Sequence, residues 1–170
     1  MNIFICQTPF QLYFSEQVIG SFKGESENII FFSKGQNRKN SKNILYHNLQ
    51  AENKLAYILK HFRAKNRITF FAKKYKGDLN VFIPHVGSLL TSFVFNSTEL
   101  LNLNVKINLL YEGVLYFYEF NEKYGWPHKY RWIIGLFIGI NYRYTPQVLP
   151  VNSERISRIY TPFPDFTRGD

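Results

Sequence analysis

The fold of this chain is decided by residues 3–11, which read IFICQTPFQ. The first four of these residues are apolar and form a run of the length and character of a strand that is buried on both faces, as the strands of parallel sheets are. Thr8, Pro9 and Gln11 then occupy the N-cap, the first position and the third position of a helix that begins with a capping box. The pattern predicts a buried strand that passes directly into a helix, which we expect to end near Phe22 and before Gly24.

Strand-like and helix-like segments alternate along the rest of the chain. Short apolar runs predict further strands at 29–32, 44–46, 81–83, 105–110 and 156–160, and apolar residues at helical spacing predict helices at 55–62, 88–95 and 129–140. This order predicts right-handed βαβ units and therefore an α/β fold with a Rossmann-like, doubly wound, mostly parallel sheet. No internal repeat and no Pro- or Gly-rich linker interrupts the sequence. We expect residues 1–170 to form a single Rossmann-like domain.

Composition narrows the class of protein. A chain of 170 residues with 45% hydrophobic residues, 17 Phe and 12 Tyr can bury an aromatic-rich core and is not disordered. The single cysteine, Cys6, excludes an internal disulfide and a CxxC-type zinc site, and fits a reducing compartment. The longest apolar stretch, from Trp132 to Ile140, is far shorter than the roughly 20 residues of a membrane span, so we interpret it as a core helix or a docking surface. Without a basic region before the first apolar run, no secretory signal is predicted, and we expect a cytoplasmic location.

The net charge of +9 predicts attraction to a polyanion: nucleic acid, an anionic membrane leaflet, a nucleotide-sugar or an acidic polysaccharide. The chain contains neither GxGxxG nor GxxxxGK[ST], and it carries no recognisable RRM, KH or helix-turn-helix signature. Basic residues between Lys60 and Lys76 fit a solvated face, or a face that touches anionic lipid. His47, His61 and His128 lack metal-ligand spacing, and no metal is expected.

Three predicted strands end in residues that can carry chemistry. These are Gln7 and Thr8 after the first strand, His85 after the strand at 81–83, and Glu112 with Gly113 after the strand at 105–110. Because the carboxyl ends of parallel strands share one edge of a sheet, we expect these residues to converge there. Backbone N–H groups at the start of the first helix would add attraction for an anion or a hydroxyl-rich ligand. Each residue also has a structural interpretation: Thr8 as a helix cap, His85 as a loop residue bonded to backbone, and Glu112 as a turn acid.

Three stretches of the chain resemble one known family. These are ICQTPFQ at 5–11 followed by a helix, FIPHV at 82–86, and INLLYEGVLYFY at 107–118. They are similar to the corresponding regions of bacterial sialyltransferases of the lipooligosaccharide sialyltransferase and capsular polysialyltransferase type. That family has a GT-B arrangement of two Rossmann-like domains. Its first domain carries an acidic-acidic-glycine motif, and its second domain carries a His-Pro motif and most of the nucleotide-sugar site.

The resemblance implies that Glu112 matches the second acid of that motif, the general base. Tyr111 stands where the family has its first acid, and no His-Pro dipeptide occurs in the chain. The chain thus resembles the N-terminal, acceptor-side half of such an enzyme. Implied substrate-binding residues are Gln7, Thr8, His85, Gly113, Tyr116 and Tyr118.

The implied reaction is transfer of sialic acid from CMP-sialic acid to a surface glycan acceptor, by inverting, base-assisted attack and without a cofactor. The implied partners are the glycan acceptor, the nucleotide-sugar donor, a C-terminal domain, an anionic membrane contacted peripherally and a second copy of the chain, but not nucleic acid. The aromatic residues between Tyr111 and Trp126 fit sugar stacking, or a core and inter-domain surface. Two alternatives remain: a non-catalytic Rossmann-like interaction domain and a basic nucleic-acid-binding module.

Overall fold

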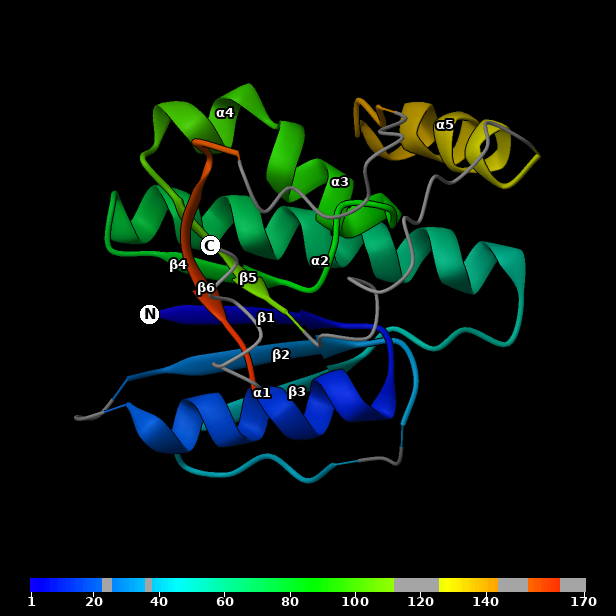
Figure 1. Cartoon of the computed structure of the whole chain (residues 1–170). Helices are drawn as coiled ribbons and strands as arrows, with labels where there is room; N and C mark the ends of the chain where they lie inside the picture. The colour runs from blue at the N-terminus through cyan, green and yellow to red at the C-terminus, as the bar shows by residue number, and fades with distance from the viewer. Residues whose placement is uncertain (23–25, 36–37, 112–125, 144–152, 163–170) are drawn as a thin grey trace, which may run out of the picture.

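A computed structural model describes residues 1–22, 26–35, 38–111, 126–143 and 153–162 of the chain (Figure 1). Within these ranges six strands form one sheet in which every neighbouring pair is parallel, in the order β3-β2-β1-β4-β5-β6. The strands are β1 (Asn2–Cys6), β2 (Asn28–Phe32), β3 (Ile44–Asn48), β4 (Asn80–Ile83), β5 (Lys106–Leu110) and β6 (Ile156–Tyr160). This is the strand order of the Rossmann fold, so the predicted α/β class and the doubly wound parallel sheet are confirmed.

Helices cover the two faces of the sheet unequally. The helices are α1 (Pro9–Ser21), α2 (Lys54–Tyr75), α3 (Leu89–Asn96), α4 (Thr98–Asn102) and α5 (Trp126–Ile138). Figure 1 shows α2, α3, α4 and α5 on one side of the sheet, whereas α1 is the one described helix on the other side. The second face therefore depends on a single helix for cover across the described part of the chain.

Two hydrophobic cores follow from the alternation of side chains along the strands. Ile3 and Ile5 of β1 belong to the larger core, under α2, α3 and α5. Phe4 and Cys6 of the same strand belong to the smaller core, under α1. Each strand buried between helices must be apolar on both faces, and this is why β1 reads as a continuous apolar run.

The predicted elements differ from the observed ones mainly in two helices. The helix predicted at 55–62 continues as α2 to Tyr75, because Ala64, Ile68 and Ala72 extend its buried stripe and no Pro or Gly occurs before Gly77. The helix predicted at 129–140 is α5, which starts at Trp126 and ends at Ile138. Gly139 ends it with a φ of 68°, a left-handed conformation that favours glycine. The short helix α4 has no counterpart among the predicted elements.

The order in which successive strands are added to the sheet reverses between β1 and β4. From β1 the chain proceeds outward through β2 to β3, and it then returns through α2 to β4 on the other side of β1. Ligands of doubly wound folds bind outside the carboxyl ends of the strands at such a switch point. No helix in the described part of the chain is long and apolar enough to cross a membrane.

Candidate functional site at the switch point

Gln7 and His85 lie side by side at the switch point. Gln7 directly follows β1, and His85 follows β4 after Pro84. The two side chains are joined by a hydrogen bond of 3.2 Å between Gln7 Oε1 and His85 Nε2. The structure thus brings together two of the residues that sequence reasoning placed at one edge of the sheet, although 78 positions separate them in the chain.

The hydrogen bonds of His85 fix its tautomer. The backbone N–H of Gly87 donates to His85 Nδ1 over 2.9 Å, so this nitrogen carries no proton. The proton of the neutral ring is therefore on Nε2, which donates to Gln7 Oε1. Burial, together with the positive charge of Arg131 from α5, lowers the pKa of His85 to about 4. The ring is neutral at physiological pH.

The same contact orients the Gln7 amide. Because its oxygen accepts from His85, its nitrogen Nε2 is directed elsewhere. That nitrogen is buried and has no hydrogen-bond partner among the residues that the structure describes. A buried amide donor without a partner is costly, and in native proteins it calls for a specific explanation such as a ligand. Gln7 Nε2 is the donor that this site leaves open within the described residues.

The start of α1 is closed by the chain itself. Thr8 Oγ1 accepts from the N–H of Gln11 over 3.1 Å, and Gln11 Oε1 accepts from the N–H groups of Gln7 and Thr8 over 2.6 and 3.3 Å. The predicted capping box is therefore present, and Thr8 acts as the cap. The N–H groups of Gln7, Thr8 and Gln11 are therefore hydrogen-bonded within the chain.

The start of α3, on the other side of the switch point, is closed in the same way. Ser88 is its N-cap: Ser88 Oγ accepts from the N–H of Thr91 over 3.3 Å, and Thr91 Oγ1 accepts from the N–H of Ser88 over 3.1 Å. The spacing of Ser88 and Thr91 signals this box, but sequence reasoning did not use it. The capping side chains of both helix starts are thus engaged within the chain, whereas Gln7 Nε2 is a side-chain donor without a partner among the described residues.

Two further residues of the site escaped sequence reasoning. Gly87 fixes the tautomer of His85 through its backbone N–H, and Arg131 adds positive charge from a helix far along the chain. No local pattern marks either role, because both arise from how the loop after β4 and helix α5 pack.

The remaining predicted site residues lie outside the described residues. Glu112, Gly113, Tyr116 and Tyr118 belong to the stretch 112–125, of which the structure gives no placement. Just before it, Tyr111 is buried at the end of β5, and its N–H donates to the carbonyl of Tyr160 over 2.7 Å. Only the strand that leads to Glu112 is therefore described.

The other histidines have local structural partners. His61 Nδ1 contacts the carbonyl of Tyr57 over 2.9 Å, and His128 Nδ1 contacts the hydroxyl of Tyr142 over 2.8 Å. His47 is hydrogen-bonded to the guanidinium of Arg67. Within the described ranges, no group of three or more His, Cys, Asp or Glu side chains is arranged to hold a metal ion.

Comparison with known proteins assigns no family: no family model, no curated protein and no solved structure matches the chain.

Proposed function

We propose that this chain is the acceptor-side half of an inverting glycosyltransferase that transfers sialic acid from CMP-sialic acid to a glycan. The observation that carries the proposal is the hydrogen-bonded pair of Gln7 and His85 at the switch point of the sheet. A neutral pair that leaves an amide donor open suits the hydroxyl groups of a sugar. The nearby charge of Arg131 suits an anionic group on the same ligand. We take the identity of the donor and the type of reaction from the three motifs that resemble those of sialyltransferases.

The reaction needs a base that His85 does not provide. An acceptor hydroxyl attacks the anomeric carbon, the bond from that carbon to the phosphate of CMP breaks, and the hydroxyl proton must pass to a base. His85 is a weak base with a pKa of about 4, and both of its ring nitrogens already form hydrogen bonds. We assign the base to Glu112. His85 instead acts as a positioning residue for the Gln7 amide, which holds the acceptor.

Departing CMP carries the electron pair of the broken bond and requires positive charge or a proton donor. In the family that this chain resembles, a second domain supplies that group together with the nucleotide site. The proposal therefore assigns acceptor binding, and not donor binding, to the residues described at the switch point.

Acceptor binding is accordingly the property to test. Fluorescently labelled chain is applied to a glycan array, and the glycans it retains are titrated against wild type and Gln7→Leu. Loss of a hydrogen bond from the amide should weaken binding by roughly tenfold. Gln17→Leu is the matched control, because Gln17 is exposed on α1. If no glycan is retained, or if Gln7→Leu binds as well as wild type, the proposal is wrong.

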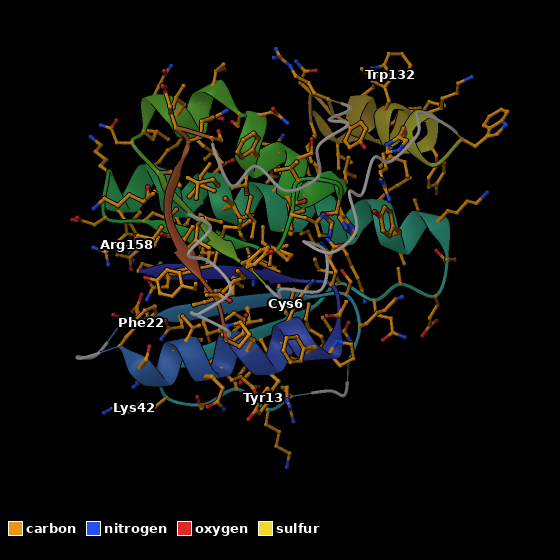
Figure 2. All side chains as sticks on the ribbon, viewed as in Figure 1. Cys6, Tyr13, Phe22, Lys42, Trp132 and Arg158 are labelled. Carbon is orange, nitrogen blue, oxygen red and sulfur yellow. The ribbon has the colours of Figure 1, made fainter. Side chains whose placement is uncertain are left out.

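A transferase that modifies surface glycolipid needs access to a membrane, and α5 supports such a contact. Trp132, Ile133, Leu136 and Phe137 are exposed, with Phe137 at 78%, and Figure 2 shows Trp132 on the outer side of this helix. Lys129 adds positive charge over the exposed ring of Trp126. Aromatic and apolar side chains flanked by lysines are typical of helices that lie in the interface of anionic membranes. We therefore extend the proposal to peripheral binding of α5 to an anionic leaflet.

A further inference from the structure

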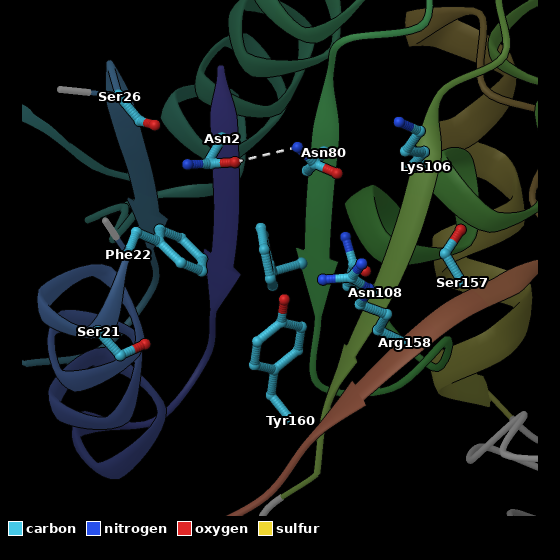
Figure 3. A pocket seen from close by; sticks show the side chains of 11 residues that line it. Asn2, Ser21, Phe22, Ser26, Asn80, Lys106, Asn108, Ser157, Arg158 and Tyr160 are labelled. Carbon is cyan, nitrogen blue, oxygen red and sulfur yellow. Dashed lines mark hydrogen bonds between the residues drawn. The ribbon is translucent and has the colours of Figure 1, made fainter. Parts of the chain in front are cut away.

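A hollow lies on one face of the sheet (Figure 3). It has a volume of about 640 Å³ and is lined by residues of β1, β4, β5 and β6 and by the end of α1. Asn2, Asn80 and Lys106 are the first residues of strands β1, β4 and β5, and Tyr160 is the last residue of β6, so the hollow extends along the sheet from its amino-terminal edge. Its lining includes neither Gln7 nor His85, so the hollow is separate from that pair.

The hollow is on the face of the sheet that carries α1. Phe82 of β4 belongs to the core under α1. Asn108 of β5 is in register with Phe82 on one side and with Arg158 of β6 on the other. Side chains in register on parallel strands project to the same side. Strands of a parallel sheet are normally apolar on both faces, yet here β5 and β6 present amide and basic groups. The polar lining is a departure from what the fold alone requires.

The charges of the lining all have one sign. Lys106 and Arg158 are its two cations, and no Asp or Glu belongs to it. Neither cation forms an ion pair with any residue that the structure describes. Two cations without a carboxylate in one hollow attract an anion, and a partly enclosed site strengthens that attraction relative to open solvent.

Asn108 supplies an independent sign of a ligand. Its side chain lines the hollow with those cations and is 2% exposed, and its Nδ2 has no hydrogen-bond partner within the described part of the chain. A leucine would fill such a position in a parallel sheet without leaving a donor unpaired. The amide is explained if it donates to a hydroxyl or an anionic oxygen of a bound molecule.

Hydrogen bonds between three asparagine side chains on neighbouring strands hold the Asn80 amide in place. Asn2 Nδ2 donates to Asn28 Oδ1 over 3.0 Å, and Asn80 Nδ2 donates to Asn2 Oδ1 over 3.2 Å, the contact drawn in Figure 3. Because its nitrogen is engaged, Asn80 offers its oxygen as the acceptor on the wall of the hollow. Donors and acceptors fixed before binding reduce the entropic cost of holding a ligand with several hydroxyls.

Aromatic rings form the remaining wall. Phe82, Phe22 and Tyr160 contact one another, with ring centroids 5.9 Å apart for Phe22 and Phe82, 5.2 Å for Phe82 and Tyr160 and 6.4 Å for Phe22 and Tyr160. Such rings pack against the C–H faces of sugars, while the tyrosine hydroxyl adds a polar end. A simple inorganic anion would make no use of this wall.

We propose that this hollow binds an anionic monosaccharide. Lys106 and Arg158 hold its carboxylate or phosphate, Asn80 and Asn108 hold its hydroxyls, and the aromatic wall packs against its ring. The inference is independent of the proposed transferase activity, because it uses none of the switch-point residues.

Calorimetric titration of the whole chain tests it. The probes are N-acetylneuraminic acid, which carries a carboxylate, and glucose 6-phosphate, which carries a phosphate; glucose and inorganic phosphate are the controls. We expect at least one anionic sugar to bind more tightly than both controls, and the tighter probe identifies the anionic group. Lys106→Gln and Arg158→Gln should each weaken that binding about tenfold, the usual weight of a charged hydrogen bond. Lys39→Gln, at an exposed lysine outside the hollow, and Gln7→Leu should leave it unchanged.

Three results would overturn the inference. The first is no binding of either anionic sugar. The second is that neither anionic sugar binds more tightly than inorganic phosphate and glucose. The third is equal affinity of wild type, Lys106→Gln and Arg158→Gln for the sugar. Circular dichroism of each variant checks that the fold is kept, which is expected because Lys106 and Arg158 are exposed.

Discussion

At the scale of single residues, the chemistry of the switch point depends on the protonation of His85. Its folded-state pKa of about 4 is below the ordinary value of 6.5 because the ring is buried and Arg131 is near. The hydrogen bond from Nε2 to Gln7 and the one from Gly87 to Nδ1 both require the neutral ring in one tautomer. Protonation of Nδ1 would remove the second bond and place a positive charge in a buried site.

We predict that His85 makes stability depend on pH. Because its pKa is lower in the folded state, the unfolded chain binds more protons between pH 6.5 and 4. The contribution is fully present above about pH 6.5 and is lost as the pH falls toward 4, by on the order of 2–3 kcal/mol. Urea unfolding at a series of pH values measures this for wild type and for His85→Gln, which does not titrate.

The comparison with His85→Gln is needed because burial also lowers the pKa values of His47 and His61. These two histidines should weaken both proteins equally on acidification. A wild-type stability profile parallel to that of His85→Gln would show that His85 titrates normally and would contradict the assigned tautomer.

Asn108 gives a second prediction at this scale. Asn108→Leu should raise the free energy of unfolding by roughly 1 kcal/mol, because it replaces an unpartnered buried amide with an apolar group. It should also weaken binding of the anionic sugar. Asn66→Leu, on the exposed side of α2, controls for added hydrophobicity. Thermal unfolding and calorimetry measure the two effects, and a destabilised Asn108→Leu would assign the amide a structural role instead.

How far the sequence predicts the site depends on the kind of residue. Gln7 and His85 were placed together because each follows a strand, and parallel strands end at one edge. Thr8 and Gln11 revealed their capping box through spacing alone. Arg131 was not foreseeable, because no sequence rule places α5 beside the loop after β4.

At the scale of helices and strands, sequence patterns fix the existence of elements better than their ends. The strand predicted at 156–160 is β6 with the same bounds, because β-branched residues begin and nearly end it. The sequence predicts helix α2 at little over a third of its observed length, because Arg67 and Thr69 are polar and Phe70 is apolar but lies off the buried stripe, at 61% exposure. Its buried small residues, Ala64 and Ala72, carry little hydrophobic signal.

Two helical glycines should respond in opposite ways to the same substitution. A Cβ at Gly135 in α5 would be 2.6 Å from the carbonyl oxygen of Ile140, so Gly135→Ala should cost about 1–3 kcal/mol. Gly20 near the end of α1 has no atom within 4 Å of an added Cβ, so Gly20→Ala should add up to about 1 kcal/mol. Chemical denaturation of both variants measures the difference. Equal effects would mean that the turn after α5 relaxes freely around the new methyl group.

Helix α5 gives the prediction on membranes. The chain should co-sediment with vesicles that contain phosphatidylserine, and less with vesicles of phosphatidylcholine alone, because its net charge is +9. Trp132→Ala combined with Phe137→Ala removes two large exposed side chains and should weaken binding at least tenfold. Tyr13→Ala, at an exposed aromatic of α1, is the matched control. Equal binding of the double variant and wild type would exclude α5 as the contact.

At the scale of the whole molecule, one sheet separates two candidate sites. The carboxyl edge holds the pair of Gln7 and His85, and the face that carries α1 holds the polar hollow around Asn108. The sequence predicts the first because doubly wound sheets have a general rule for their carboxyl edge. It does not predict the second, since the hollow arises where α1 leaves β4, β5 and β6 without a described helix on that face. The unequal cover of the two faces becomes visible only once the strand order is known.

The last prediction concerns catalysis by the complete transferase, in which a donor-binding domain accompanies this one. If Glu112 is the base, Glu112→Gln should lower the rate of sialyl transfer by roughly 10²–10⁴-fold at saturating acceptor, because an amide cannot take the hydroxyl proton. Glu112→Asp keeps the charge but shortens the side chain, so its rate should fall between those of wild type and Glu112→Gln.

Binding measurements separate this role from a structural one. Glu112→Gln should leave the glycan affinity of the Gln7 site and the thermal stability unchanged. Gln7→Leu should raise the KM for the acceptor more than it lowers kcat, because Gln7 binds the acceptor in both the ground and the transition state. Single-turnover transfer from CMP-sialic acid gives the chemical step directly. If Glu112→Gln transfers sialic acid at a rate within a few-fold of wild type, Glu112 is a turn residue and not the base. The proton of the acceptor must then pass to another group, since His85, with a pKa of about 4 and both nitrogens engaged, is a poor substitute.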